Sequence, residues 1–158
     1  MELLESTSDL DLLIAPVGGG GLLCGTLISV RSMTATGAAH AAVYGAEPSA
    51  ADDTFRSFAA GKRIALSDTP NTIADGLRTS IGLITFPIIR DSSTAILTAS
   101  ETSIVRAMRM MFERMKLVVE PSAAVPLACM LEDPQRFAGK RVGLIISGGN
   151  VDLEQLPW

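Results

Sequence analysis

The feature of this sequence that most constrains its fold is a run of four glycines, Gly18 to Gly21. The run follows the apolar stretch 12–17 and opens into a helix-like segment that starts at Leu22. Four consecutive residues without Cβ atoms let backbone N–H groups converge on one small anion, and the positive end of the following helix points to the same place. The run therefore predicts a phosphate-binding turn, with a purely structural strand-to-helix turn as the alternative.

A second glycine turn occurs near the end of the chain. Ser147, Gly148, Gly149 and Asn150 follow the apolar, strand-like run 142–146. In α/β proteins with a mainly parallel sheet, ligands bind at the carboxyl ends of the strands. Two glycine turns that each follow a strand therefore suggest one shared crevice, and this second turn favours the phosphate interpretation of the first.

The glycine run does not match the commoner nucleotide-binding loops. A dinucleotide fingerprint, G-x-G-x-x-G, fails because its third glycine position falls on Leu23 or Cys24, depending on the starting glycine. A P-loop needs a lysine after its last glycine, and Thr26 follows Gly25. Both of these nucleotide-binding classes are excluded by single residues.

Strand-like and helix-like segments alternate along the 158 residues. This alternation predicts a single α/β domain, residues 1–158, with a mainly parallel sheet flanked by helices. Strands are expected at 11–17, 41–46, 94–98 and 142–146, and helices at 21–36, at 48–60, from 100 and from 121. In the helix from 100, an apolar stripe at helical spacing is predicted to be core. The stripe comprises Ile104, Val105, Met108, Met111, Phe112 and Met115.

Composition excludes several classes of protein. A net charge of −4 and an aromatic content of 4% argue against nucleic-acid binding, which needs a basic face and stacking rings. No apolar run reaches the roughly 18 residues of a membrane span, and the first residues carry acids where a secretory signal carries bases. We therefore expect a cytoplasmic protein without membrane contact. Cys24 and Cys129 are expected to be buried free thiols.

Five motifs resemble the fold type II pyridoxal-phosphate enzymes, specifically the C-terminal portion of the serine racemase and serine/threonine dehydratase family. They stand in the family's order and cover nearly the whole chain. The motifs are PVGGGGL (16–22), GAEPSAADD (45–53), TIADGL (72–77), ERMK through EPSA (113–123) and SGGNVDL (147–153). The resemblance implies the tryptophan synthase β-like fold, with pyridoxal 5′-phosphate as cofactor.

The resemblance assigns roles to residues of both glycine turns. It implies that the backbone amides of Gly18, Gly19, Gly20, Gly21 and Leu22 hold the cofactor phosphate. Ser147 would offer its hydroxyl to the pyridine nitrogen, although most serines beside glycine pairs serve as helix caps or turn residues. Asn150 would shape the same wall, and Gly76 and Glu120 are expected to face the pocket.

A cation site is implied by a different segment. Glu47 and Asp53 lie six residues apart, with the Ala51 carbonyl between them. In the resembled enzymes this arrangement binds a divalent cation through oxygen ligands, which suits Mg²⁺, Ca²⁺ or Mn²⁺. Spacing alone favours another interpretation, in which the acids lie at the N-terminus of a helix and interact with its dipole.

The lysine that forms the Schiff base in this family is not found in the chain. No lysine precedes the glycine run, and neither Lys62, Lys116 nor Lys140 stands in a suitable motif. We therefore expect no catalytic residue in this chain, which would be a C-terminal portion that is inactive alone. The full-length enzyme is expected to be a homodimer that acts on a small amino acid.

The resemblance implies β-elimination from a 3-hydroxy amino acid such as serine, threonine or threo-3-hydroxyaspartate. The products are a keto acid and ammonia, so the parent enzyme would be a lyase. Two alternatives stay open at this point. One is amino-acid (serine) racemisation, which shares the first proton step. The other is a non-catalytic module for phosphate binding or oligomerisation.

Overall fold

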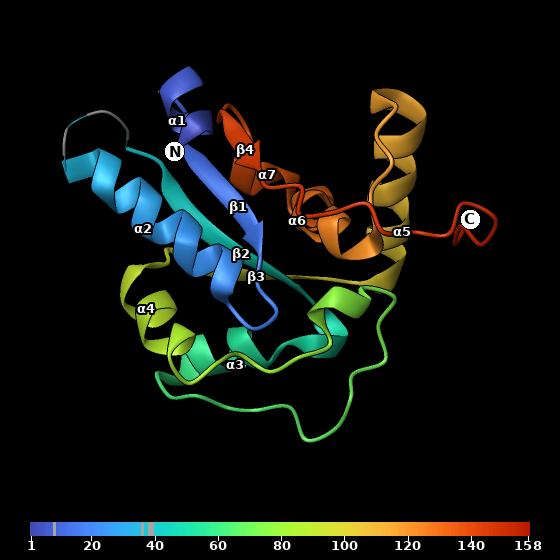
Figure 1. Cartoon of the computed structure of the whole chain (residues 1–158), viewed down its shortest axis with the longest axis horizontal. Coiled ribbons are helices and arrows are strands. Elements are labelled where there is room, and N and C mark those ends of the chain that lie inside the picture. Colours follow the sequence, from blue (N-terminus) through green and yellow to red (C-terminus); the bar gives the residue numbers. More distant parts are fainter. Residues whose placement is uncertain (8, 36, 38–39) are drawn as a thin grey trace.

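A parallel four-stranded sheet forms the centre of the computed structural model, which describes residues 1–7, 9–35, 37 and 40–158 (Figure 1). The strands are β1 (Leu12–Pro16), β2 (Ala42–Pro48), β3 (Ala95–Ala99) and β4 (Val142–Leu144). The α-helices are α1 (Glu2–Ser6), α2 (Gly21–Ala35), α3 (Asp53–Ala60), α4 (Thr85–Ser92), α5 (Glu101–Met110), α6 (Pro121–Glu132) and α7 (Pro134–Phe137). Shorter turns are η1 (Ser49–Ala51), η2 (Asp75–Leu77) and the π-helical η3 (Met111–Met115).

The strand order β3-β2-β1-β4 places β1 in the interior of the sheet. Leu12 of β1 lies opposite Ala42 of β2 on one side and opposite Val142 of β4 on the other. The chain moves from β1 through β2 to β3 in one direction and then returns to the far side of β1. This reversal makes the gap between β1 and β4 the switch point at which ligands bind in parallel α/β sheets. The predicted fold class is confirmed.

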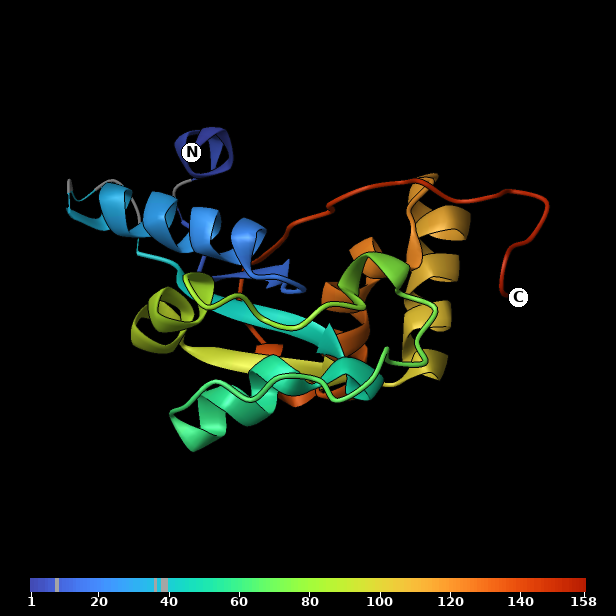
Figure 2. The ribbon, with the colours of Figure 1, turned by 60° about the horizontal axis from the view of Figure 1, so that its bottom comes forward.

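Each face of the sheet packs against its own core, because alternate strand residues point to opposite faces. Leu12 and Ile14 join the core under α5 and α6, while Leu13 and Ala15 join the core under α2 and α4. Figures 1 and 2 show α2 on one face of the sheet and α6 on the other. Strands buried on both faces explain why 12–17 reads as continuous apolar sequence.

Most expected elements are present, with changes at their ends. Gly61 ends α3 in the left-handed conformation, with φ of 67°, and the strand expected at 142–146 ends at Leu144. Cys24 and Cys129 are buried free thiols, as expected, and burial raises the pKa of both. No helix in the described ranges is long and apolar enough to cross a bilayer.

The apolar stripe expected after position 100 is only partly core. Ile104, Met108 and Met111 are buried, whereas Phe112 and Met115 are 38% and 56% exposed. From Met111 the helix becomes π-helical, and this wider turn moves later side chains off the 3.6-residue repeat. Phe112 instead contacts Trp158, with 5.8 Å between ring centroids, in the C-terminal segment that runs from β4 towards α5 (Figure 2).

Lys116 follows this π-helical turn and is strained. It is the one non-glycine residue in the described ranges with positive φ, at 59°. We expect Lys116→Gly to increase the free energy of unfolding by about 0.5–1 kcal/mol, because glycine lacks the Cβ penalty there. Thermal unfolding should show a midpoint higher by roughly 2–4 °C per kcal/mol gained. Lys140→Gly, at an exposed lysine without positive φ, serves as control and should not stabilise.

Candidate functional site: a cavity between two glycine turns

A cavity of about 290 Å³ lies where β1 and β4 end. The first glycine turn follows β1, and Ser147 follows β4, so the parallel pairing of these strands brings the two turns together. Helix α6 and the η2 turn complete the wall. The lining residues are Pro16, Val17, Gly18, Gly19, Gly21, Leu22, Gly76, Leu77, Glu120, Ser122 and Ser147.

Two of the four glycines in the first turn are required by the fold itself. Gly18 and Gly20 have φ of 50° and 88°, a region that L side chains rarely adopt. A Cβ atom on Gly20 would also lie 2.6 Å from Ile81 Cδ1 and 2.8 Å from Thr85 Oγ1. The Thr85 hydroxyl donates a hydrogen bond to the carbonyl of Gly19 at 2.7 Å, which ties the turn to α4. Gly20 therefore faces the protein interior.

The other two glycines face open space. A Cβ atom on Gly21 would meet nothing within 4 Å, and one on Gly19 would meet only Thr79 Cγ2 at 3.9 Å. Neither residue has positive φ. Packing and backbone conformation therefore do not require glycine at these two positions. Their missing side chains keep the mouth of the cavity open.

Backbone donors line this opening. The N–H of Gly20 binds the carbonyl of Val17 at 2.9 Å within the turn. The N–H groups of Gly19, Gly21 and Leu22 have no acceptor among the described residues. The first N–H groups of a helix are unsatisfied, and α2 begins at Gly21. Free N–H groups at the positive end of a helix form a site suited to a phosphate or carboxylate group.

The second turn is glycine-rich because of its close packing against 118–120. A Cβ atom on Gly148 would lie 2.7 Å from Glu120 Oε2, and one on Gly149 would lie 2.7 Å from the carbonyl oxygen of Val118. These approaches leave no room for a side chain. Only Ser147 of this turn lines the cavity.

The start of α6 holds the remaining wall in place. The buried Ser122 accepts a hydrogen bond from the N–H of Gly76 at 3.0 Å through its hydroxyl. Glu120 Oε2 accepts one from the N–H of Asn150 at 3.0 Å. Sequence reasoning missed Ser122, although a serine in the first turn after the helix-initiating Pro121 is a residue type that often binds nearby backbone groups.

The structure brings together most of the residues predicted for the cofactor site. Gly18, Gly19, Gly21 and Leu22 lie in the wall with three other predicted residues, Gly76, Glu120 and Ser147. Two predicted residues are not in the wall: Gly20, which faces the interior, and Asn150, whose backbone N–H binds Glu120. No lysine lines the cavity within the described ranges.

The predicted cation ligands form a separate buried acidic pair. Glu47 is 2% exposed and Asp53 is 1% exposed. Glu47 Oε1 accepts the N–H of Phe55 at 2.6 Å, and Asp53 Oδ2 accepts the N–H of Ile81 at 2.8 Å. Burial, with a smaller contribution from the charge of Asp53, raises the pKa of Glu47 to about 8. Burial also raises the pKa of Asp53.

These two carboxylates have no ion-pair partner within the described chain. Ala51 is buried in the short η1 turn between β2 and α3. The described residues contain no group of three or more His, Cys, Asp or Glu side chains that could hold a metal. A cation here would therefore need backbone carbonyls or waters besides the two acids. Oxygen ligands of this kind suit Mg²⁺ or Ca²⁺.

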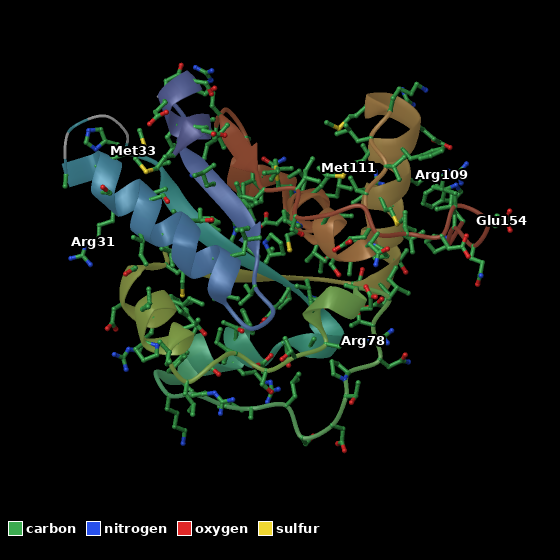
Figure 3. The ribbon with its side chains drawn as sticks, in the orientation of Figure 1. Arg31, Met33, Arg78, Arg109, Met111 and Glu154 are labelled. Atoms are coloured by element: carbon green, nitrogen blue, oxygen red, sulfur yellow. The ribbon has the colours of Figure 1, made fainter. Side chains whose placement is uncertain are left out.

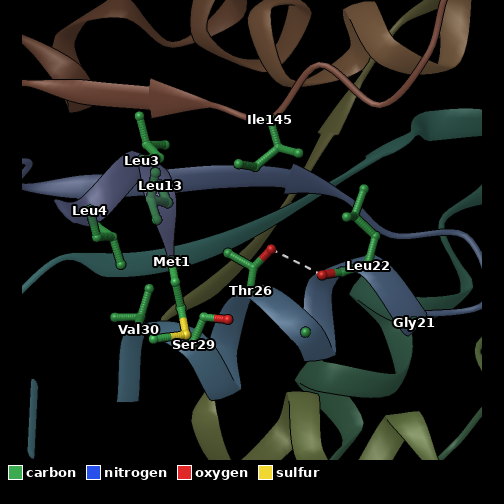
Figure 4. A pocket seen from close by; sticks show the side chains of 11 residues that line it. Met1, Leu3, Leu4, Leu13, Gly21, Leu22, Thr26, Ser29, Val30 and Ile145 are labelled. Carbon is green, nitrogen blue, oxygen red and sulfur yellow. Dashed lines mark hydrogen bonds between the residues drawn. The ribbon is translucent and has the colours of Figure 1, made fainter. Parts of the chain in front are cut away.

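A second cavity, of about 380 Å³, shares Gly21 and Leu22 with the first (Figure 4). Its other lining residues are mainly aliphatic, and the Thr26 hydroxyl at its edge donates to the carbonyl of Leu22 at 2.9 Å. No charged side chain of the described residues lines it. The cavity between the glycine turns is therefore the better candidate for an anionic ligand.

A parallel α/β fold with an anion-binding turn at its switch point defines a class of proteins that bind phosphate-bearing cofactors. The family model "Pyridoxal-phosphate dependent enzyme" matches residues 1–148. The chain therefore belongs to the pyridoxal-phosphate dependent enzyme family.

Relatives and solved structures agree with this assignment. The chain is 46% identical over 157 residues to a beta-hydroxyaspartate dehydratase of Paracoccus denitrificans, covering 99% of this chain and 48% of the relative. The crystal structure of a serine racemase from Dictyostelium discoideum is similar, with a TM-score of 0.85, 46% identity, and coverage of 96% and 48%. The crystal structure of a threonine deaminase from the organism abbreviated T.th. gives a TM-score of 0.84, 46% identity, and coverage of 90% and 51%. The chain spans about half the length of these proteins.

The two kinds of glycine in the first turn should respond differently to alanine. Gly20→Ala should lower the free energy of unfolding by about 2 kcal/mol or more, because the new Cβ meets Ile81 and Thr85 at a positive φ. Gly21→Ala should leave stability unchanged or slightly raised, since the position is open and begins a helix. Urea unfolding of both variants measures this difference. Equal losses at the two positions would contradict the division of roles.

Proposed function

We propose that the cavity between the glycine turns binds pyridoxal 5′-phosphate. The proposal rests on one observation above all, that Gly19, Gly21 and Ser147 line the same cavity. The N–H groups of Gly19, Gly21 and Leu22 would hold the phosphate, with Gly18 and Gly20 shaping the turn. Ser147, at the opposite turn, would face the pyridine nitrogen.

When bound, pyridoxal phosphate supplies an electron sink that labilises bonds at the substrate Cα. A neutral hydroxyl at Ser147 does not hold a proton on the ring nitrogen, unlike a carboxylate, and so moderates this sink. Moderate electron withdrawal suits loss of a β-substituent. Leu77 and Pro16 would cover apolar surface of the bound group, while Gly76 leaves room beside the carboxylate of Glu120.

We propose that the chain is the C-terminal portion of an enzyme that eliminates the β-hydroxyl of a small 3-hydroxy amino acid. The dehydratase and deaminase names among its relatives support this reaction. The Schiff-base lysine would come from the half of the family fold that this chain does not span, so the chain alone should not turn over substrate. We expect the whole enzyme to be a cytoplasmic homodimer.

Racemisation is the second candidate, because the chain is 45% identical over 161 residues to the serine racemase of Dictyostelium discoideum. Elimination releases ammonia and a keto acid, whereas racemisation releases neither. Assaying the enzyme assembled with a lysine-bearing half for both products and for the D-amino acid separates the two reactions. A purely binding module would give none of them.

We further propose a divalent cation, Mg²⁺ or a similar ion, beside Glu47, the carbonyl of Ala51 and Asp53. Two adjacent buried carboxylates without a paired cation are costly, and a bound cation would remove that cost. Such an ion would tie the end of β2 to the start of α3. It lies outside the wall of the cofactor cavity, which makes its role structural in this proposal.

Gly21→Ala tests the phosphate site. The added methyl group should lower the affinity for pyridoxal phosphate at least about tenfold, because it fills space in the cavity mouth. Fluorescence titration with pyridoxal phosphate measures the change. Gly25→Ala is the matched control, since Gly25 is equally open but does not line the cofactor cavity. Unchanged binding by Gly21→Ala would contradict the site, and the absence of wild-type binding would contradict the proposed cofactor.

The acidic pair makes stability depend on pH. The pKa of Glu47 rises on folding from 4.5 to about 8, so the folded state binds more protons between these values. Without divalent ions, the free energy of unfolding should therefore fall by on the order of a few kcal/mol as pH rises from about 4.5 to 8. Glu47→Gln should flatten this dependence in urea unfolding.

Saturating Mg²⁺ should stabilise the wild type at pH 8 and leave Glu47→Gln nearly unchanged, because only the ionised pair binds the cation. Glu154→Gln, at an exposed acid, serves as control. Equal Mg²⁺ stabilisation of Glu47→Gln and the wild type would place the cation elsewhere.

A further inference from the structure

We propose that Glu120 is a positioning residue, whose carboxylate holds the Ser147–Asn150 turn in place by accepting a backbone hydrogen bond instead of touching the ligand. This inference rests on the proposed function only in assigning the ligand to pyridoxal phosphate. The mechanical part, the clamp on the turn, is independent of any ligand.

Glu120 makes both hydrogen bonds that join the 147–150 turn to the rest of the described chain. The N–H of Glu120 donates to the carbonyl of Gly148 at 3.2 Å, and Glu120 Oε2 accepts the N–H of Asn150 at 3.0 Å. The preceding ladder bond, from Ile145 to Ile14, belongs to the sheet. The turn therefore has one anchor, and its side-chain half is the Glu120 carboxylate.

Close packing turns this anchor into a fixed contact. The carboxylate lies against the Cα of Gly148, where a Cβ atom would be 2.7 Å from Oε2 and 3.0 Å from Oε1. Gly148 is thus the residue that allows the carboxylate to reach the N–H of Asn150. Ser147, one residue before, is placed in the cavity wall by the same contact.

The position of Glu120 fits a clamp better than a ligand contact. A carboxylate in the wall of an anion-binding cavity repels a phosphate group, so its charge is unfavourable for the ligand. Its Oε2 is already used by a backbone donor. Glu120 is also the residue from which α6 begins, and Ser122 in the first turn of α6 binds the N–H of Gly76 on the opposite loop. The first turn of α6 therefore spaces two walls of the cavity.

Alanine and glutamine at position 120 separate the clamp from a charge effect. Glutamine keeps a side-chain oxygen that can accept the N–H of Asn150, whereas alanine does not, and both remove the charge. We expect Glu120→Ala to weaken binding of pyridoxal phosphate about tenfold and Glu120→Gln to stay within about threefold of the wild type. If charge alone mattered, both variants would bind more tightly and to the same extent.

A double-mutant cycle tests whether Glu120 acts through Ser147. In a Ser147→Ala background, Glu120→Ala should weaken pyridoxal phosphate binding less than about threefold, because the hydroxyl that it positions is gone. Independent, multiplicative losses would show that Glu120 contacts the ligand itself and would overturn the proposal. The control is Glu154→Gln, which removes a negative charge in the C-terminal loop near α5 (Figure 3).

A ligand-free measurement keeps this inference separate from the proposed function. In two-dimensional amide NMR spectra of the free chain, Glu120→Ala should shift the signals of 147–150, because their anchor is lost, while the signals of α2 stay in place. Glu120→Gln should restore most of the wild-type pattern. Unaltered 147–150 signals in Glu120→Ala would disprove the clamp. Failure of the wild type to bind pyridoxal phosphate would disprove the cofactor proposal alone.

Discussion

The pairing of β1 with β4 is the interaction on which the site depends. These strands are parallel neighbours, so the turns that leave them emerge at the same edge of the sheet, although about 130 residues separate them in sequence. Without this pairing, the first glycine turn would be an anion-binding loop with no opposite wall. The contact between strands thus combines two local motifs into one cavity.

Glycine serves three different purposes around this cavity. Gly20 satisfies the positive φ and the packing of the first turn, Gly148 admits the Glu120 carboxylate, and Gly21 leaves space empty. Only the last purpose points to a ligand. Selection for function and selection for fold can therefore be separated residue by residue, because a Cβ atom has a different cost at each position.

Much of the fold and part of the site followed from the sequence, because strand burial and glycine turns are local signals. The β1 and β4 runs and the end of α3 at Gly61 are of this kind. Ser122 and the orientation of Asn150 were not predicted, since both depend on which loop packs against α6. The π-helical turn at Met111 also left no mark in the apolar pattern, which continues regularly to Met115.

The central claim is that both glycine turns contact one ligand, and titration of the labelled chain with pyridoxal phosphate, followed by amide NMR, tests it most directly. The account predicts that signals of 18–22 and of 147–150 shift together with a single dissociation constant. Signals of residues around the apolar cavity, such as Val30, should stay unchanged. Shifts confined to one turn, or different dissociation constants for the two turns, would contradict the account.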